Sequence, residues 1–544
     1  MPETTGPAYP RSMAIVGHRA WTLRTVLSGR GPSDLRAHPW GALAVLCVSI
    51  LVVNLDNTIL NVALPTLVRK LDATSSELQW IVDSYAMVFA GLLLVGGSLA
   101  DRFGRKRLFL IGLTVFACAS VGAAFSGTVA QLIAWRAAMG AGAALTMPAT
   151  LSIINDLFRD PRERSRAIGL WAGTSGIGIA IGPIAGGLLL SHFWWGSVFF
   201  VNVPIVVVGL IGAVLLVPGS KNPDAKRPDP AGGLLSMLGL GCVLWAIIEA
   251  PAHGWSSAKV VAVGVAGLAV LGVFVAWEAR SDHPMLNLAF FRARRFSAAT
   301  SSLSLGVFAL FGALFVQSQF LQFDLHLSAI GAGVRILPIA AVVALTAPLS
   351  VLVVRFVGSK ATAGAGLLSI AGGLFEVSMV SGPATTYHEV LPGMILIGLG
   401  AGLLMPTATD AVIGSLPAGD AGVGSATNGV AIQVGGALGV AVVGSVLSTR
   451  YQHELTAAAG SRLLPPAVLH TALGSIGGAL DVAAKLPQAA GAQLARAAGA
   501  AFMSGLGISL AAGASVALAG LAVALIALPS RPSPDAVRRA PSDR

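Results

Sequence analysis

A small number of ionisable side chains lie inside long apolar stretches of this sequence, and these residues are the best placed to do chemistry. They are Asp56, Asp83, Arg136, Glu376 and Asp410. An ionisable group in apolar surroundings is costly and usually functional. Burial favours the neutral form of a carboxyl group, whereas a neighbouring guanidinium favours the charged form. A buried acid beside an arginine can therefore bind a proton and release it again.

Asp56 and Arg136 are predicted to lie at a similar depth in two different helices. At a rise of about 1.5 Å per residue, Asp56 lies about 22 Å from the inner end of its helix and Arg136 about 10 Å from the outer end of its own. In an apolar core about 30 Å thick, the two side chains can meet. They form either a proton-binding site or a buried ion pair that only fixes helix packing.

The other three acids are predicted in less central positions. Asp83 is expected near the outer end of its helix, either as a second carboxylate for a proton or a cationic solute, or as an interfacial residue in contact with water. Asp410 lies near the inner end of a later helix and is a further candidate for coupling to protons or substrate. Glu376 is expected to snorkel or to cap a helix.

The apolar stretches around these residues identify an integral membrane protein. Of the 544 residues, 55% are hydrophobic and 11% are charged, whereas soluble proteins carry about 25% charged residues. One transmembrane helix needs about 20 mainly apolar residues. On this criterion fourteen helices are expected, at residues 41–62, 79–99, 108–126, 129–151, 166–190, 197–217, 231–249, 259–277, 298–320, 332–354, 361–381, 389–413, 422–447 and 502–528.

The distribution of lysine and arginine predicts the orientation in the membrane. With both termini in the cytoplasm, the inner segments hold 26 of these residues and the outer segments hold eight. Four of the eight lie in one long connection, 450–500, and long connections count little in this rule. Residues 1–40 and 529–544 are then cytoplasmic tails. The 450–500 connection is expected to be an extracytoplasmic loop, partly helical.

A weak internal repeat predicts two halves. Gly140-Ala141-Gly142 is followed by Met147-Pro148, and Gly400-Ala401-Gly402 is followed by Met405-Pro406. There are two shorter matches: Arg102-Phe103 recurs as Arg355-Phe356, and Pro161 recurs as Pro417. The three matches occur in the same order in both halves. Each match is weak by itself, but their shared order favours an internal duplication.

The duplication predicts an all-α membrane protein of two six-helix halves, 41–217 and 298–528. A linker at 218–297 carries two extra helices, 231–249 and 259–277. Such halves, with a solute site at their interface, are typical of secondary transporters. The net charge of +11 does not indicate nucleic-acid binding, because no soluble domain with a basic face is expected. The three cysteines match no metal-binding pattern, and no constellation of nucleophiles indicates an enzyme.

A dense group of charges separates the second and third predicted helices. These charges must lie in water, and the basic ones mark the cytoplasmic side. Asp101 is expected to pair with the basic residues that follow it or with free amides at the next helix start. Because the echo at Arg355-Phe356 lacks an aspartate, we expect an asymmetric latch between the halves. The residues of this predicted gating loop are Gly97, Asp101, Arg102, Gly104, Arg105 and Lys106.

Four ordered segments resemble motifs of a known family. Residues 97–107 are similar, position by position, to the loop motif of the major facilitator superfamily. Residues 54–65, 132–144 and 178–187 resemble the first-, fourth- and fifth-helix motifs of its fourteen-helix drug:proton antiporter branch. Within that branch the sequence looks most similar to quaternary-ammonium and multidrug efflux pumps. Met139 stands where the fourth-helix motif commonly has glutamine.

The resemblance implies a major facilitator fold and a proton-coupled antiporter that exports amphipathic, cationic compounds. It implies no cofactor, because a proton gradient drives transport. Its partners would be an amphipathic small molecule, protons and the lipid bilayer. The protein would function as a monomer in the bacterial cytoplasmic membrane. A dedicated exporter of one native product, such as a lipid, a siderophore or a self-made antibiotic, is the alternative within the same fold.

The resemblance also marks a glycine-rich stretch in the fifth predicted helix as the antiporter motif. We expect these small residues to keep the helix slim and to let it pack tightly against the opposite half, which limits leakage. The residues are Gly178, Gly182, Pro183, Gly186 and Gly187.

Aromatic side chains near the acids could form a cavity for lipophilic cations through cation–π contacts. Each of them could equally face lipid or pack in the core. They are Trp80, Tyr85, Trp135, Trp171, Phe308, Phe311 and Phe315.

Overall fold

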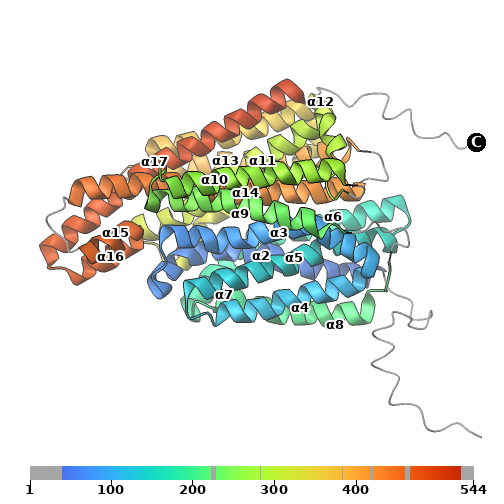
Figure 1. The fold of residues 1–544 in the computed structure, drawn as a ribbon, viewed down its shortest axis with the longest axis horizontal. Helices are drawn as coiled ribbons and strands as arrows, with labels where there is room; N and C mark the ends of the chain where they lie inside the picture. The colour runs from blue at the N-terminus through green and yellow to red at the C-terminus, as the bar shows by residue number, and fades with distance from the viewer. Residues whose placement is uncertain are drawn as a thin grey trace, which may run out of the picture.

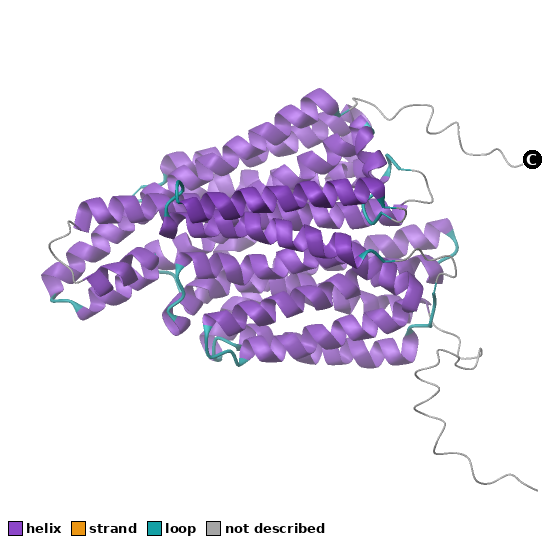
Figure 2. Cartoon of the chain, in the orientation of Figure 1, coloured by secondary structure: helices purple, strands orange, loops and turns teal. Residues whose placement is uncertain are grey.

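The computed structural model describes residues 39–528 except 222–227, 282–283, 383, 417–420 and 460–465. Both predicted tails therefore lie outside the described residues, apart from the last two positions of the first. The described chain is helical throughout its regular structure and contains no strand (Figure 2). The all-α membrane fold predicted from the hydropathy pattern is confirmed.

The first helices form one bundle, here called the N-terminal bundle. Its sixth span is broken after four residues, so that two helices make up one crossing. The bundle consists of α2 (Pro39–Leu71), α3 (Ser75–Phe103), α4 (Arg105–Ala124), α5 (Val129–Leu157), α6 (Pro161–His192), α7 (Ser197–Phe200) and α8 (Asn202–Leu216).

Two further helices, α9 (Pro230–His253) and α10 (Ala258–Arg280), follow as an antiparallel pair. The remaining elements form the C-terminal bundle. They are η1 (Leu288–Arg292), α11 (Arg294–Gln319), η2 (Phe320–Asp324), α12 (Ala329–Val380), α13 (Tyr387–Ile413), α14 (Ala421–Ala459), α15 (Pro466–Gly474), α16 (Ile476–Lys485) and α17 (Gln488–Ala527).

Local sequence signals explain where several helices begin. Thr74 caps α3 with a full capping box, because its side chain accepts from Glu77 N while the Glu77 carboxylate accepts from Thr74 N. Asp160 caps α6 and is followed by Pro161 at the first helical position. Gly104 separates α3 from α4 with φ of 108°, a conformation that glycine adopts readily.

Helix α12 contains two membrane crossings. Thirteen described helices are long and apolar enough to cross a membrane. One of them, α12, has 52 residues, and at 1.5 Å per residue it would be roughly 78 Å long, far more than the apolar core of a bilayer. Its backbone is non-helical at Gly358, with φ of 86° and ψ of 162°. The break lies between the predicted helices 332–354 and 361–381, so the predicted number of fourteen crossings agrees with the structure.

The described residues of the 450–500 segment are mostly helical, which confirms the expected helical content, but they contain more helix than a partly helical loop would. Helices α14 and α17 continue beyond their predicted ends, and α15 and α16 connect them as a short helical hairpin. In Figure 1 this hairpin projects at the left, beyond the other helix ends. Hydropathy found only the part of each helix that is apolar enough for lipid, which is why the polar extensions were missed.

The two bundles meet chiefly through α3 with α14 and α6 with α12, and α2 makes smaller contacts with α11, α16 and α12. Hydrogen bonds join them near the predicted outer ends. Ser318 Oγ donates to Asn61 O at 2.5 Å, and Gln322 Nε2 donates to Val62 O at 2.9 Å. Ser445 Oγ donates to Gln79 Oε1 at 3.2 Å. The contact of the bundles on this side therefore includes polar groups that hold a defined register.

The inserted pair is in direct contact with both bundles. Helix α9 packs against α3 and α14, and in Figure 1 the green α9 and α10 run across the boundary between the lower, N-terminal bundle and the upper, C-terminal bundle. Leu240, Leu244 and Ile248 of α9 share an apolar cluster with Ala437 and Ala441 of α14. The insertion is thus part of the contact between the bundles and not a detached spacer.

The packing of the glycines refines the predicted repeat. A methyl group on Gly140 would lie 2.4 Å from Tyr85 O of α3, and one on Gly142 would lie 2.8 Å from Gly112 O of α4. In the C-terminal bundle, Gly398 makes the corresponding close contact with the first part of α12, and Gly400 makes the one with the second part. The match of Gly140 with Gly400 is therefore wrong by two residues.

The break in α12 can be tested by adding one methyl group. Gly358→Ala should destabilise the protein by about 1–3 kcal/mol, because its backbone conformation is close to exclusive to glycine. Thermal unfolding of the purified protein in detergent would measure the loss. Gly372→Ala, in the same helix and with open space around the added carbon, is the matched control and should not lose stability. Equal unfolding midpoints for both variants would contradict a required break.

Candidate functional site

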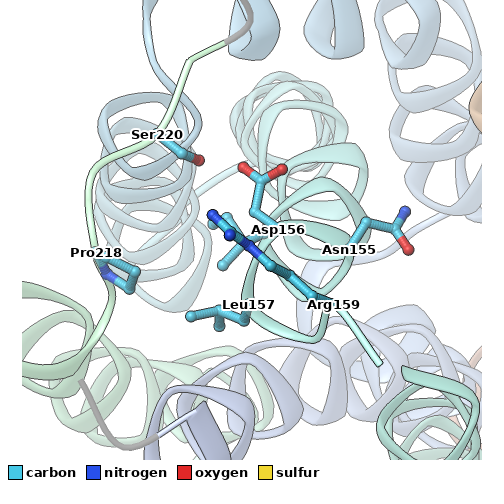
Figure 3. A pocket seen from close by; sticks show the side chains of 7 residues that line it. Asn155, Asp156, Leu157, Arg159, Pro218 and Ser220 are labelled. Carbon is cyan, nitrogen blue, oxygen red and sulfur yellow. The ribbon is translucent and has the colours of Figure 1, made fainter. Parts of the chain in front are cut away.

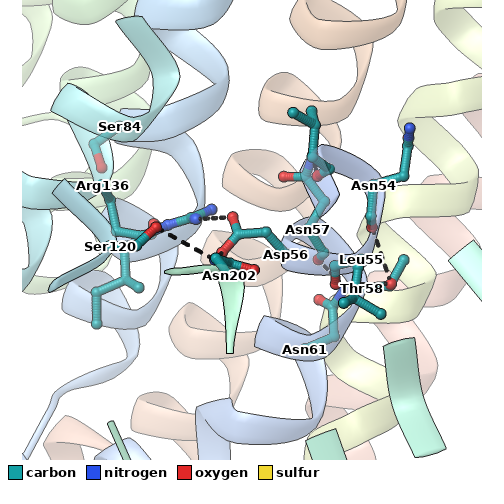
Figure 4. Close-up of polar contacts among 12 residues, drawn as sticks. Asn54, Leu55, Asp56, Asn57, Thr58, Asn61, Ser84, Ser120, Arg136 and Asn202 are labelled. Carbon is teal, nitrogen blue, oxygen red and sulfur yellow. Dashed lines mark hydrogen bonds and ion pairs between the residues drawn. The ribbon is translucent and has the colours of Figure 1, made fainter. Parts of the chain in front are cut away.

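The buried Asp56 carboxylate is bound from both sides. Asp56 is 1% exposed and Arg136 is 0% exposed. Arg136 Nη1 lies 2.5 Å from Asp56 Oδ2, and Asn202 Nδ2 donates to Asp56 Oδ1 at 2.9 Å. The same amide approaches Ser120 Oγ at 3.4 Å, as Figure 4 shows. The predicted meeting of Asp56 and Arg136 at one depth is confirmed.

Arg136 also has partners other than the acid. Its Nε donates to Ile81 O of α3 at 3.1 Å. Its guanidinium carbon lies 4.5 Å from the centre of the Tyr85 ring, a cation–π distance. The guanidinium is therefore held in place by α3 as well as by Asp56.

Five helices contribute groups to this network. Asp56 comes from α2, Ser120 from α4 and Arg136 from α5, while Tyr85 and the Ile81 carbonyl come from α3. Asn202 is the first residue of α8, directly after the break that separates α7 from α8. Sequence reasoning missed Asn202 as a site residue, although an amide opening an otherwise apolar helix was a usable signal.

Asp83 is fully buried and has no hydrogen-bond partner. It is 0% exposed, and neither carboxylate oxygen is bonded within the described chain. It lies one helical turn from Gln79, which contacts Gly444 of α14, and from Met87, which contacts Gly241 of α9. Asp83 therefore faces the junction of α3, α9 and α14. The alternative of a water-exposed interfacial residue is wrong.

The remaining predicted acids lie apart from this site. Asp410 is exposed near the inner end of α13, which ends at Ile413. Glu376 is half-buried in the second part of α12 and faces Gly393 of α13, where a methyl group would meet Glu376 Oε2. It neither caps a helix nor reaches a helix end, so that expectation is wrong. Neither side chain joins the Asp56–Arg136 network.

The gating loop is organised around Arg105. Its Nε lies 2.8 Å from Asp101 Oδ1, and its Nη1 pairs with Asp156 of α5. The Arg105 backbone N donates to Ser220 O at 2.9 Å, and Lys106 Nζ donates to Val214 O at 2.9 Å. The predicted pairing of Asp101 with a following basic residue is confirmed.

The remaining residues of the loop have simpler surroundings. A methyl group added to Gly97 would lie 3.6 Å from Pro148 Cβ of α5. The Arg102 guanidinium lies 5.8 Å from the ring of Phe103. Within the described chain, the hydrogen bonds and ion pairs of the loop are with the N-terminal bundle and the segment after α8. The expected latch between the halves stays a prediction.

A polar pocket of about 410 Å³ lies beside this loop. Figure 3 shows its lining, which comes from the inner end of α5 and from the segment after α8. Asp156 is 20 residues after Arg136, which is roughly 30 Å along α5. The pocket therefore belongs to the face that is predicted to be the inner one and not to the buried site. It is lined by Ile153, Asn155, Asp156, Leu157, Arg159, Pro218 and Ser220.

Most of the glycines of the antiporter motif pack within their own bundle. Methyl groups on Gly178, Gly182 and Gly186 would meet α2, at Leu51 O, the Thr58 side chain and Ile59 O. For these three residues the expected packing against the opposite half is wrong. The spacing of four residues places them on one helix face, and that face is turned toward α2.

The neighbouring face of α6 does contact the opposite bundle. A methyl group on Gly187 would lie 2.5 Å from the Ile330 Cα of α12, and one on Gly333 would lie 2.2 Å from Pro183 O. For Gly187 and Pro183 the expectation is confirmed. Helix α6 is thus slim on two faces, one toward α2 beside Asp56 and one toward α12.

The predicted aromatic cavity does not form in this structure. Tyr85 lies at the Arg136 guanidinium, but Trp135 is 41% exposed on the other side of α5 and lies against Gly122. Trp80 Nε1 donates to Glu249 Oε1 of α9 at 3.3 Å. Phe308, Phe311 and Phe315 of α11 pack on glycines of α14. Of these six side chains, Tyr85 alone contacts the Arg136 guanidinium.

Two helical bundles around a buried, fully bonded acid define a multi-pass membrane transport protein. The chain belongs to the major facilitator superfamily, because the model described as Major Facilitator Superfamily matches residues 46–440. The resemblance noted in the sequence motifs is thereby confirmed.

Curated relatives align over most of this chain. The multidrug efflux pump LfrA of Mycolicibacterium smegmatis is 37% identical over 466 residues, which cover 85% of this chain and 91% of the relative. The methyl viologen resistance protein SmvA of Salmonella typhimurium is 33% identical, with 83% and 90% covered. The tetracenomycin C resistance and export protein of Streptomyces glaucescens is 33% identical, with 77% and 78% covered.

Solved structures confirm the fold. A bacterial homolog to the human lysosomal transporter Spinster superposes with a TM-score of 0.62 at 18% identity, covering 90% of this chain and 97% of that chain. At this level of identity the likeness concerns the fold alone.

The buried ion pair predicts a strong coupling between two substitutions. Asp56→Asn or Arg136→Gln alone should each cost about 3–5 kcal/mol, because each leaves an uncompensated buried charge. The double variant should lose clearly less than the sum, which chemical denaturation in detergent would measure. Arg496→Gln, at an exposed position of α17, is the control. Additive losses would show that the two side chains do not interact.

The loop predicts a kinetic defect. Asp101→Ala removes one of the two carboxylates that hold Arg105, and we expect slower turnover with largely unchanged substrate affinity. Transport rates and equilibrium binding in proteoliposomes would separate the two quantities. Glu163→Ala, an exposed acid in the first turn of α6, is the matched control on the same side. Lost binding with unchanged turnover would be the opposite of this expectation.

Proposed function

We propose that this protein is a proton-coupled antiporter that exports amphipathic, cationic compounds across the bacterial cytoplasmic membrane by alternating access. The observation that carries the proposal is the buried Asp56 carboxylate, held by Arg136 and Asn202. The printed names of the relatives support drug export, because LfrA is a multidrug efflux pump and SmvA confers resistance to methyl viologen, a cation.

The geometry of the Asp56 site suits reversible protonation. A proton on Oδ2 would replace the Arg136 guanidinium as the partner of that oxygen. Arg136 would remain supported by the Ile81 carbonyl and the Tyr85 ring, so losing the ion pair would not leave it without partners. Asn202 can donate to Oδ1 in both states and so keeps the carboxyl oriented. Protonation would then loosen the contact of α2 with α5 without dismantling the site.

Asp83 is proposed as the second acid of the cycle. A carboxylate without hydrogen bonds in apolar surroundings is costly, and a bound proton or a cationic solute removes that cost. Its position at the junction of α3, α9 and α14 means that either ligand would act on the contact between the bundles. Asp410, exposed near the inner end of α13, would meet protons or solute only on the cytoplasmic side.

The contacts of the two bundles support solute entry from the inner side. Ser318 and Gln322 bond across the bundles near the outer ends, and Gly187 packs on α12 on that side. Around Gly169, Gly173 and Gly176, in the inner half of α6, an added methyl group would meet no atom within 4 Å. In the proposed cycle the solute enters here, the bundles rock, and outside protons displace it.

Several further features belong to the proposal. Both termini would lie in the cytoplasm, because lysine and arginine gather on that side. The proton gradient would supply the energy without a cofactor, and one chain would contain the complete transport path, so the protein would act as a monomer. These points follow from the predicted orientation and from the two bundles of a single chain.

A dedicated exporter of one native product is the second candidate. One relative is named for the resistance to and export of tetracenomycin C, and another for resistance to puromycin. The buried acids would serve coupling equally well in such a protein, whereas the cargo would be a single compound.

The role of Asp56 can be tested by export of a fluorescent cation. Asp56→Asn, present in the membrane at the normal level, should abolish export of ethidium against a gradient, because the site can no longer exchange a proton. Glu163→Gln, an exposed acid outside the site, should export at the normal rate. Wild-type export by Asp56→Asn would remove Asp56 from the coupling mechanism.

A vesicle experiment distinguishes a multidrug antiporter from a dedicated exporter. In inverted vesicles energised with a proton gradient, a broad panel of lipophilic cations should each cause proton movement if the protein is a multidrug antiporter. Proton movement with none of the cations would instead favour the dedicated exporter.

A further inference from the structure

Two buried carboxylates meet at one end of the inserted helices, away from the transport site. Asp229 caps α9: its Oδ1 accepts from Gly232 N at 3.0 Å, and its Oδ2 accepts from Trp277 Nε1 at 2.7 Å. Glu278 lies in the last turn of α10, and its Oε2 accepts from Leu286 N at 3.0 Å. Asp229 is 9% exposed and Glu278 is 3% exposed.

One oxygen of this pair has no partner among the described residues. Glu278 Oε1 is buried and makes no hydrogen bond within that part of the chain. A methyl group on Gly232 would lie 2.6 Å from Glu278 Oε1 and 3.0 Å from Asp229 Oδ2, and 3.2 Å from the Met285 methyl. The two oxygens therefore converge on one point, with an apolar side chain beside them. A glycine at position 232 leaves the space that this approach needs.

The helix ends act in opposite ways on the two acids. Asp229 lies at the N-terminus of α9, where the helix dipole favours a negative charge. Glu278 lies at the C-terminus of α10, where the dipole disfavours one. The antiparallel packing of α9 and α10 brings these unlike ends together. Of the two carboxyl groups, Glu278 is thus the better placed to hold a proton.

Within the described chain, no basic side chain pairs with either acid. Arg280, the nearest cation on α10, is exposed and donates to Ala276 O. From α3, the groups nearest to a methyl group on Gly233 are Val95 and the Gly91 carbonyl, which do not titrate. The segment after α10 contributes Met285 and the Leu286 amide. Two negative charges that approach the same point are unfavourable without a cation. A single proton shared by the pair therefore relieves the repulsion.

We propose that Asp229 and Glu278 form a proton-binding site that responds to the pH of the cytoplasm and is separate from the transport site. When the site is occupied, a proton taken from water resides on Glu278 Oε1 and is directed toward Asp229 Oδ2. When it is released to water, two negative charges face each other in a buried position. The cytoplasmic side of the site follows from the predicted orientation of the chain.

Deprotonation would act on the connection to the C-terminal bundle. Glu278 holds the Leu286 amide, and this segment continues through η1 into α11, the first helix of that bundle. Asp229 fixes the start of α9, which packs on α3 of the N-terminal bundle. The pair thus holds together the start of α9 and the segment after α10. The charge of the pair would determine how firmly these two segments are held.

Infrared spectroscopy of the full-length protein in liposomes tests the site directly. As the pH is raised between about 5 and about 9, the range in which buried acids titrate, the wild type should lose a carboxylic-acid band. Glu278→Gln should lack that band. Glu249→Gln, an acid at the opposite end of α9, is the matched control and should keep it. An unchanged band in Glu278→Gln would overturn the proposal.

Transport measurements separate this site from the transport site. With the outside pH constant, wild-type transport should change several-fold as the inside pH varies across the same range, and Glu278→Gln should flatten this response while still exporting a fluorescent cation. A full pH response in Glu278→Gln would overturn the proposal. So would a titration that shifts when sodium or potassium is added, because that would identify a metal-cation site. Failure here would leave proton coupling at Asp56 untouched, since that is tested by Asp56→Asn.

A second variant guards against a purely structural role. Gly232→Ala places a methyl group between the two carboxyl groups and should shift the infrared titration, because it separates the oxygens. If Gly232→Ala and Glu278→Gln both lower the thermal unfolding midpoint while the titration and the pH response stay as in the wild type, the pair serves packing only and the proposal is wrong.

Discussion

The structure depends on keeping one buried carboxylate fully bonded inside an apolar bundle. An ion pair such as Asp56 with Arg136 is favourable only when its geometry is good and its remaining hydrogen-bonding groups are satisfied. Here the other carboxylate oxygen has the Asn202 amide, and the guanidinium has a carbonyl and an aromatic ring of α3. The hydrogen-bonding groups of this network come from five helices, which must pack together around the ion pair. The polar network therefore constrains how the N-terminal bundle is assembled.

The small residues of α6 connect this network to the opposite bundle. Gly182 and Gly186 bring α6 against Thr58 and Ile59, within one turn of Asp56 on α2. On its next face, Gly187 brings the same helix against α12. Without a hydrophobic driving force between helices in lipid, such close approach is a main source of association. A change in the ionisation of Asp56 therefore lies one helix away from the contact between the bundles, and α6 is the element that would transmit it.

The inserted helices α9 and α10 make polar contacts with the two bundles between which they lie. On one side, Glu249 accepts from Trp80 of α3, and Trp255 donates to Thr449 of α14. Asp83 faces α9 and α14 from the first third of α3. At the opposite end, the Asp229 and Glu278 carboxyl groups hold the start of α9 and the segment after α10. The insertion is thus hydrogen-bonded to both bundles at one end, and at the other end the two acids hold its start and the segment that leads to the C-terminal bundle. These contacts give it a means of influencing the relative movement of the bundles.

Hydropathy, charge counts and motifs determined much of this protein. They predicted the fourteen crossings, the family and the depth of Asp56 and Arg136, because these properties depend on the residues within one helix or one loop. The faces on which helices meet were decided only by the tertiary structure. The glycines of the antiporter motif turned toward α2 as well as α12, and the expected aromatic cavity did not form. Asn202 and the Asp229–Glu278 pair gained their significance from residues far apart in the sequence. Periodicity shows that a helix has a face, but only packing in three dimensions decides which neighbour that face meets.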